Sequence, residues 1–195
     1  MSLLKERIRR LEADLCAVPM RHYIYNDLPF AIFVYRPEEE WSMRREANLL
    51  KTRLEERISR EVHFVSLAEL LWQSIDESEG MDALIALESQ DGFDSAQQQA
   101  QDYLSDPDWR PLPGLLKEQL DQLDPVKDLV LIWRAGALAP NIYRVSKLLD
   151  EMKGRSTVPC VLFMPATVEG SDGLKFMGIA STMPRGSYHT KVYLD

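Results

Sequence analysis

The chain has 195 residues, of which 45% are apolar, and carries a formal net charge of −8 at pH 7. This length and composition predict one domain with a buried core and exclude a wholly disordered chain. The longest apolar runs, such as residues 30–35, are far shorter than the roughly 20 residues that cross a bilayer. The first ten residues mix both charge signs and contain no apolar signal core. We therefore expect a cytoplasmic protein without a membrane partner, in which Cys16 and Cys160 are reduced.

The charge is unevenly distributed. Residues 76–128 contain 14 acidic and 3 basic side chains, whereas residues 173–194 contain Lys175, Arg185 and Lys191 and no acid. Because affinity for phosphate comes from Lys and Arg, the acidic middle would repel nucleic acid. We expect no direct tight nucleic-acid binding by this chain.

The first third of the chain predicts a helix, a strand and a helix. Residues 2–16 carry an apolar stripe of Leu4, Ile8, Leu11 and Leu15 at helical spacing. Residues 30–35 are apolar on both faces, as in a central parallel strand. Pro37 can open a helix without losing a needed N–H, and the following three glutamates favour its first turn. This helix should extend to about residue 58.

The middle of the chain begins with a second strand, residues 62–65. A short helix over residues 67–75 follows, with Ser66 and Glu69 as its capping box. Glycines and prolines then break residues 76–127 into pieces with helical patterns. We interpret this segment as an acidic helical insertion between the second and third strands. Its packing residues should be Leu84, Leu87, Phe93, Tyr103, Leu104 and Trp109.

The last third predicts a third strand over residues 129–133 and a helix from about Pro140 to Met152. A fourth strand over residues 158–164, a short helix over 174–179 and a last strand over 188–194 follow. Alternating strands and helices indicate one α/β domain with a mainly parallel sheet of about five strands flanked by helices. The strands over residues 30–35, 129–133 and 158–164 should be central.

Motifs for catalysis and cofactors are missing from the sequence. Neither GxxxxGK[ST] nor GxGxxG occurs, and the segment after the first predicted strand, from Arg36 to Glu40, has three acids and no glycine. His22, His63 and His189 share no ligand spacing, and no CxxC or nucleophile elbow occurs. We therefore expect no cofactor, no metal site and no catalytic residues.

In parallel α/β sheets, functional loops follow the carboxyl ends of strands. Here such loops should begin at Tyr35-Arg36, Trp133-Arg134 and residues 165–167. Trp and Arg are the residues that dominate interaction hot spots, although a core Trp beside a solvated Arg is the favoured explanation of this pair. Gly136 would permit a tight turn, and Pro140 would fix the helix start. Arg144, one turn into that helix, would reach the loop or bind a carboxylate inside the domain. The candidate partner-binding residues are Tyr35, Arg36, Trp133, Arg134, Gly136, Pro140 and Arg144.

Several segments resemble the BrxB family of BREX phage-defence systems. They are residues 30–46, 65–71 and 131–149, with the Gly-Ala-Leu-Ala-Pro-x-x-x-Arg core from Gly136 to Arg144, and then residues 159–165, Gly170 and residues 174–176. The chain departs from the family at two places. Trp133-Arg-Ala-Gly136 replaces a Thr-Gly-Val-Gly type of turn, and residues 187–190 replace paired tyrosines followed by arginine.

The resemblance implies an accessory role in a BREX complex. The implied partner is a PglZ-like phosphatase-superfamily protein, with a BrxC-like ATPase as a second one. Two hypotheses remain open: a non-catalytic adaptor, and an α/β enzyme with a degenerate nucleotide- or nucleic-acid-processing site. A deep polar cleft with converging acids at the strand ends would favour the enzyme, and a shallow apolar patch would favour the adaptor.

Overall fold

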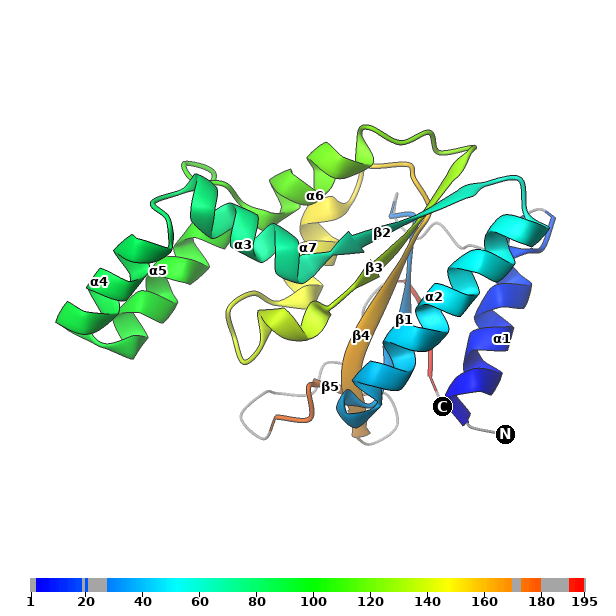
Figure 1. The fold of residues 1–195 in the computed structure, drawn as a ribbon, viewed down its shortest axis with the longest axis horizontal. Helices are drawn as coiled ribbons and strands as arrows, with labels where there is room; N and C mark the ends of the chain where they lie inside the picture. Colours follow the sequence, from blue (N-terminus) through cyan, green and yellow to red (C-terminus); the bar gives the residue numbers. More distant parts are fainter. Residues whose placement is uncertain (1–2, 19, 21–27, 170–172, 180–189, 195) are drawn as a thin grey trace.

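A computed structural model describes residues 3–18, 20, 28–169, 173–179 and 190–194. Its sheet has the strand order β2-β3-β4-β1-β6, with every neighbouring pair on this path parallel. A further strand, β5, pairs with β4 in the antiparallel direction. The predicted α/β class with a mainly parallel sheet is therefore confirmed (Figure 1). The strands are β1 Phe30–Tyr35, β2 Glu61–Ser66, β3 Asp128–Trp133, β4 Cys160–Glu169, β5 Gly173–Phe176 and β6 Lys191–Tyr193.

Strands β1, β3 and β4 lie inside the sheet, as their apolar character on both faces predicted. All six residues of β1 are buried. Successive side chains of β1 alternate between two separate cores, so that Ile32 belongs to one and Phe33 to the other. The same alternation in β3 and β4 explains why these strands read as continuous apolar runs.

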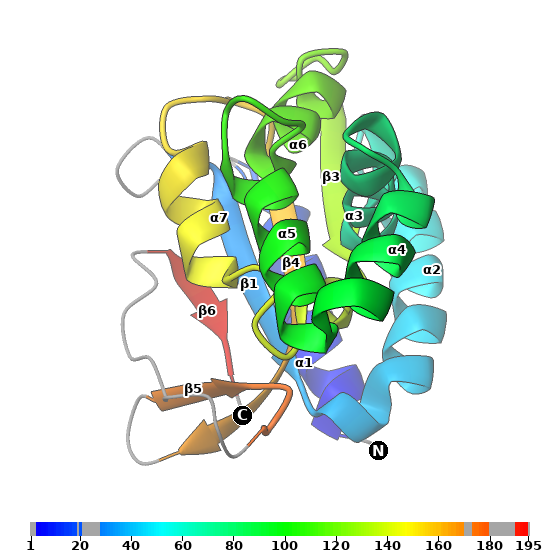
Figure 2. The ribbon, with the colours of Figure 1, turned by 90° about the vertical axis from the view of Figure 1, so that its left-hand side faces the viewer.

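Helices cover both faces of the sheet. Helices α1 (Leu3–Leu15) and α2 (Glu40–Arg57) pack on one face, and α6 (Leu112–Leu120) and α7 (Val145–Met152) pack on the other (Figure 1). Helix α3 (Leu67–Glu77) leads away from β2 toward α4 (Met81–Asp91) and α5 (Phe93–Ser105), which lie side by side farthest from the sheet (Figures 1 and 2).

The predicted starts of three helices are confirmed, with one refinement. The four apolar stripe residues of α1 are all buried. The helix that Pro37 opens begins with one 3-10 turn, Pro37–Glu39, before α2 proper. At α3 the Ser66 hydroxyl accepts a hydrogen bond from the Glu69 backbone N–H at 3.3 Å, as the capping pattern indicated.

Residues 76–127 contain helices α4, α5 and α6, as the sequence pattern predicted. Of the expected packing residues, Leu84, Tyr103 and Leu104 are buried, and Leu87 and Trp109 are partly buried. Phe93 was wrongly assigned to the packing, because its side chain is 62% exposed at the first position of α5.

Two predicted elements in the last third are wrong. Residues 174–179 form strand β5 and a turn rather than a helix, because this stretch pairs with the extended end of β4. Helix α7 begins at Val145, not at Pro140. The start of the predicted last strand, at residues 188–189, lies outside the described residues. Among the helices that the structure describes, none is both long and apolar enough to cross a membrane.

The connections between the strands run across the sheet in two opposite directions. From β1 the chain crosses to β2 by way of α2 on one face, and it then returns through β3 to β4 with α3, α6 and α7 on the opposite face. Right-handed crossovers running in opposite directions require helices on opposite faces. The carboxyl ends of the neighbouring strands β1 and β4 lie side by side at the edge of the sheet where functional loops gather.

Candidate functional site

The carboxyl-end edge consists of the ends of β1, β2, β3 and β4 and the segments that follow them. Tyr35 lies opposite Pro165 in the register of β1 and β4. The predicted loop at residues 165–167 does not exist, because β4 continues through these residues to Glu169 and pairs there with β5. The other two predicted segments, after β1 and after β3, do lie at this edge.

Tyr35 is buried at the end of β1, and its hydroxyl donates a hydrogen bond to Glu40 Oε2. Burial, followed by the Glu40 carboxylate, raises the pKa of the Tyr35 hydroxyl well above its usual range. The other Glu40 oxygen accepts a hydrogen bond from Arg44 Nε at 2.7 Å, an ion pair between residues one helical turn apart. Arg44 also stacks over Trp41, with 5.0 Å between the guanidinium carbon and the ring centroid. Tyr35 is thus a packing residue rather than an exposed contact.

A small cleft of about 260 Å³ opens between the carboxyl end of β1 and the extended part of β4. Its buried cation is Arg7, which donates to the Val34 carbonyl and lies 3.7 Å from Glu39. Arg36 is exposed at the rim. The lining contains two arginines and, among the described residues, no Asp or Glu: it is Arg7, Val34, Tyr35, Arg36, Ala166, Thr167, Val168 and Leu194. The cleft is suited to an anion and lacks the converging acids expected of a hydrolytic site.

Trp133 and Arg134 adopt distinct roles at the end of β3. Trp133 is half-buried and stacks on Phe64 of β2, with ring centroids 4.3 Å apart. Arg134 has a left-handed backbone (φ 57°), and its guanidinium lies 3.6 Å from Glu69 at the start of α3. Its side chain is more than a third exposed. The pair therefore combines a packing tryptophan with an accessible arginine.

The structure corrects the roles predicted for Gly136 and Pro140. Positive φ occurs at Arg134, whereas Gly136 lies in the 3-10 turn Ala135–Leu138. A Cβ at Gly136 would meet Met177 Sδ at 3.3 Å, so the absence of a side chain permits close approach of the β5 turn. Pro140 is exposed in an irregular segment before α7.

Residues 139–144 form an irregular segment because Tyr143 turns inward. Tyr143 is buried, and its hydroxyl donates to Glu151 at 2.5 Å while its backbone N–H reaches Leu138. Burial and the Glu151 carboxylate raise the pKa of the Tyr143 hydroxyl above its usual range. Arg144 then stands at the N-cap of α7, exposed and, among the described residues, without an ion pair. Of the two roles considered for Arg144, a bond to an internal carboxylate does not form among the described residues, because Arg144 precedes α7 and its side chain is exposed.

Two exposed tryptophans at this edge were not predicted. Trp41 is 78% exposed in the first turn of α2, and Trp72 is 50% exposed on α3. Each stands six residues after the last residue of a strand, Tyr35 or Ser66. Combining tryptophan positions with predicted strand ends would have found both.

Paired charges dominate the other surfaces. A groove of about 510 Å³ between α1 and α2 is lined by Lys5, Arg9, Arg53 and Arg57 around Glu12 and Glu46. Although burial works to raise the pKa of Glu12, hydrogen bonds from Arg53 and Arg57 lower it below its usual value.

The cations of the C-terminal segment are paired as well. Lys175 binds Glu169 at 2.8 Å and Lys191 binds Asp14 at 2.5 Å, whereas Arg185 lies outside the described residues. Both pairs reduce the charge available to phosphate. The expected lack of tight nucleic-acid binding stays a prediction.

One further group of side chains lies at the opposite end of the sheet. Glu61, His63 and Asp128, at the amino ends of β2 and β3, bring their potential metal-ligand atoms within 4.8 Å of one another. Sequence spacing could not reveal this group, because Asp128 joins the other two only through the pairing of β2 with β3.

A family model described as "BREX protein BrxB" matches residues 63–189, more than half of the chain. The chain belongs to the BrxB family. It is therefore a component of a BREX phage-defence system, as the resemblance implied. The match includes the quoted segments from residue 65 onward, whereas residues 30–46 precede it. No curated protein and no solved structure matched the chain.

Proposed function

We propose that this BrxB-family chain is a non-catalytic adaptor subunit of a BREX complex. Its carboxyl-end edge binds a PglZ-like phosphatase-superfamily protein, and a BrxC-like ATPase is its second partner. The proposal joins the family membership to the composition of this edge. Assembly subunits need accessible residues that gain much free energy on burial, and exposed tryptophan and arginine side chains follow the ends of β1, β2 and β3.

The observation that carries the proposal is the position of the tryptophans. Three of the four, Trp41, Trp72 and Trp133, lie at or six residues beyond the carboxyl end of a strand. The fourth, Trp109, packs edge-to-face on the buried Tyr103. Fully exposed tryptophan is costly in a monomer and is enriched where proteins dock.

Arginines accompany these tryptophans. Arg44 stacks on Trp41, and Arg134 reaches the start of the helix that carries Trp72. Arg36 and Arg144 are exposed at the same edge. Guanidinium groups form forked bonds with carboxylates, so a partner surface with acidic groups around an apolar centre fits this edge.

The direct test measures binding of the chain to its PglZ-like partner. Replacing Trp72 and Arg134 by alanine should weaken binding by at least about 2 kcal/mol, or roughly 30-fold. Both side chains are accessible, so the unfolding free energy should change little. Truncating Trp133 is less clean, because that change also removes the stack on Phe64.

A matched control lies at the other end of the sheet. Val126 and Lys127 also pair an exposed apolar side chain with an exposed cation. The variant Val126→Ala/Lys127→Ala should bind like the wild type. If the Trp72/Arg134 variant folds normally and still binds with full affinity, the carboxyl-end edge is not the interface.

A second candidate function rests on the cleft between β1 and β4. Its position at the carboxyl end of β1, beside β4, and its two arginines fit an anionic ligand, as in an α/β enzyme with a degenerate nucleotide- or nucleic-acid-processing site. Titration calorimetry with Mg·ATP separates the two functions. The adaptor should show no saturable binding, whereas micromolar affinity that Arg36→Ala abolishes would favour the enzyme.

A further inference from the structure

We propose that Glu61, His63 and Asp128 form a binding site for a divalent transition-metal ion such as Zn²⁺. This inference concerns the amino end of the sheet and does not rest on the proposed adaptor function. One imidazole nitrogen and two carboxylate oxygens are available, and they lie within 4.8 Å of one another. His63 Nε2 and Asp128 Oδ1 are already 3.1 Å apart, a separation that two ligands of one ion can have.

The backbone fixes the three side chains on one face of the sheet. Glu61 and His63 are two residues apart in β2, so they point to the same side. Asp128 is the direct cross-strand partner of Glu61 in β3. The geometry therefore follows from strand register, which is set along the whole length of the two paired strands, and not from a flexible loop.

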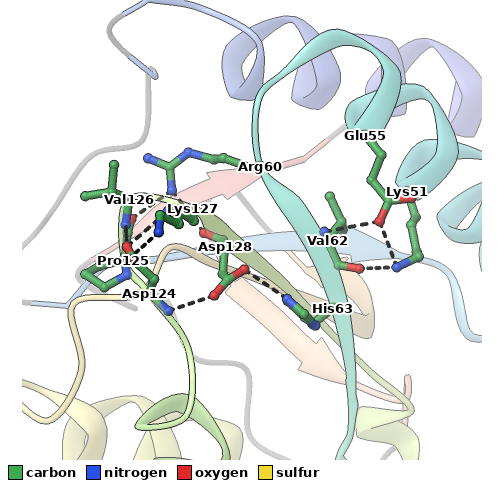
Figure 3. Close-up of polar contacts among 10 residues, drawn as sticks. All are labelled: Lys51, Glu55, Arg60, Val62, His63, Asp124, Pro125, Val126, Lys127 and Asp128. Atoms are coloured by element: carbon green, nitrogen blue, oxygen red, sulfur yellow. Dashed lines mark hydrogen bonds and ion pairs between the residues drawn. The ribbon is translucent and has the colours of Figure 1, made fainter.

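Surrounding groups orient the Asp128 carboxylate. Its Oδ2 accepts a hydrogen bond from the Asp124 backbone N–H at 2.7 Å, which leaves Oδ1 directed at His63 (Figure 3). Arg60 Nη1 donates to the Asp128 carbonyl at 3.0 Å and to the Pro125 carbonyl at 2.8 Å, which anchors the turn before β3 (Figure 3). Outer contacts of this kind position metal ligands and raise affinity.

The electrostatics also favour a cation. Glu61 and Asp128 place two carboxylates close together, and among the described residues no basic side chain pairs with Glu61. Two carboxylates at this separation repel each other. A divalent ion would offset this repulsion by binding both carboxylates together with the ring nitrogen of His63 that carries no proton.

The donor set indicates the class of ion. Imidazole nitrogen with carboxylate oxygen suits Zn²⁺ and neighbouring transition metals better than Ca²⁺ or Mg²⁺, which prefer all-oxygen sites. Three protein ligands leave a coordination position for water. Glu61 is exposed and the other two are partly buried, so an ion can enter from solvent.

The experiment titrates Zn²⁺ into the reduced, metal-stripped full chain at pH 7.5 by calorimetry. We expect one ion per chain with micromolar or tighter affinity. His63→Gln keeps an amide donor for Asp128 but is a poor metal ligand, and Glu61→Gln keeps the side-chain shape. Each should weaken binding at least about tenfold, since loss of even an outer-shell contact costs roughly that much.

The control is His22→Gln/His189→Gln, which removes the two other histidines of the chain and should leave the affinity unchanged. X-ray absorption spectroscopy at the zinc edge should show a coordination shell of nitrogen and oxygen atoms that includes one imidazole. A zinc–sulfur distance of about 2.3 Å would assign the ion to a cysteine instead and overturn the site. So would absence of saturable binding, or binding that His63→Gln and Glu61→Gln leave intact.

Discussion

At the amino end of the sheet, charged side chains join elements that are far apart in the sequence. The carboxyl end has such pairs as well, Arg7 with Glu39 and Arg134 with Glu69, but its buried tyrosines bond to carboxylates nearby in the chain. Glu12 of α1 accepts from Arg53 and Arg57 of α2, and His63 of β2 meets Asp128 of β3. By contrast, Tyr35 donates to Glu40, five residues later. The amino end is thus braced by long-range polar contacts.

The carboxyl end combines this local bracing with exposed aromatic and basic side chains. The hydroxyls of Tyr35 and Tyr143 bond to carboxylates within the chain, while Trp41, Trp72 and Arg134 remain accessible. Changes at the amino end should therefore lower stability without weakening partner binding. Changes of exposed residues at the carboxyl end should weaken partner binding without lowering stability.

The largest stability effect should follow loss of the Asp128 side chain. Asp128→Ala removes the bonds to the Asp124 N–H and to His63, which should lower the free energy of unfolding by about 2 kcal/mol. Urea unfolding in the presence of EDTA measures this change without a contribution from bound metal. Asp128→Asn, which retains one carbonyl oxygen, should lose less.

Partner binding provides the second half of this test. Asp128→Ala should bind the PglZ-like partner with wild-type affinity whenever it is folded. An unchanged unfolding free energy, or a large loss of binding by the folded variant, would show that the two ends do not divide stability and docking in this way.

A smaller effect is expected for Tyr35→Phe at the carboxyl end. Loss of the hydrogen bond to Glu40 should lower the unfolding free energy by about 1 kcal/mol, because Glu40 keeps its bond to Arg44. The raised pKa of Tyr35 also predicts the direction in which stability changes with pH. Above its ordinary value of 10.0, an unfolded chain releases the proton that the native tyrosine retains, so stability falls as pH rises.

Alkaline unfolding curves therefore check the same variant. Tyr35→Phe should lose stability less steeply than the wild type above pH 10, and Tyr35→Phe/Tyr143→Phe less steeply still. Identical slopes would mean that these hydroxyls titrate normally and that the local bracing is weak.

The contrast between the ends also explains what the sequence could predict. Apolar runs and capping residues identified β1, β3, β4 and the start of α3, since those signals are local. The rule that functional loops follow the carboxyl ends of parallel strands correctly placed Trp133 and Arg134 at the end of β3. The Glu61, His63 and Asp128 group remained hidden, because it requires the register of β2 against β3.

Errors arose where tertiary contacts override local preference. Pro140 is a good helix opener, yet the buried Tyr143 and its bond to Glu151 delay α7 to Val145. Residues 173–176 become a strand only because the end of β4 extends beyond the sheet and offers a partner. Phe93 looked like a core residue from its type alone, although it lies exposed at the first position of α5.

The smallest effect tests whether the long-range charged contacts matter for stability. Glu12→Gln removes the negative charge that Arg53 and Arg57 share. Because both arginines are at least a third exposed, solvent screening should limit the loss of unfolding free energy to about 0.5–1 kcal/mol at pH 7.

The lowered pKa of Glu12 means that this carboxyl stays ionised in the native state at a pH where it gains a proton in the unfolded chain. Its contribution is therefore present above the ordinary value of 4.5 and is lost as pH falls. As the pH falls below 4.5, the free energy of unfolding should decrease less steeply for Glu12→Gln than for the wild type. An equally steep decrease in both proteins would show that this contact does not stabilise the amino end.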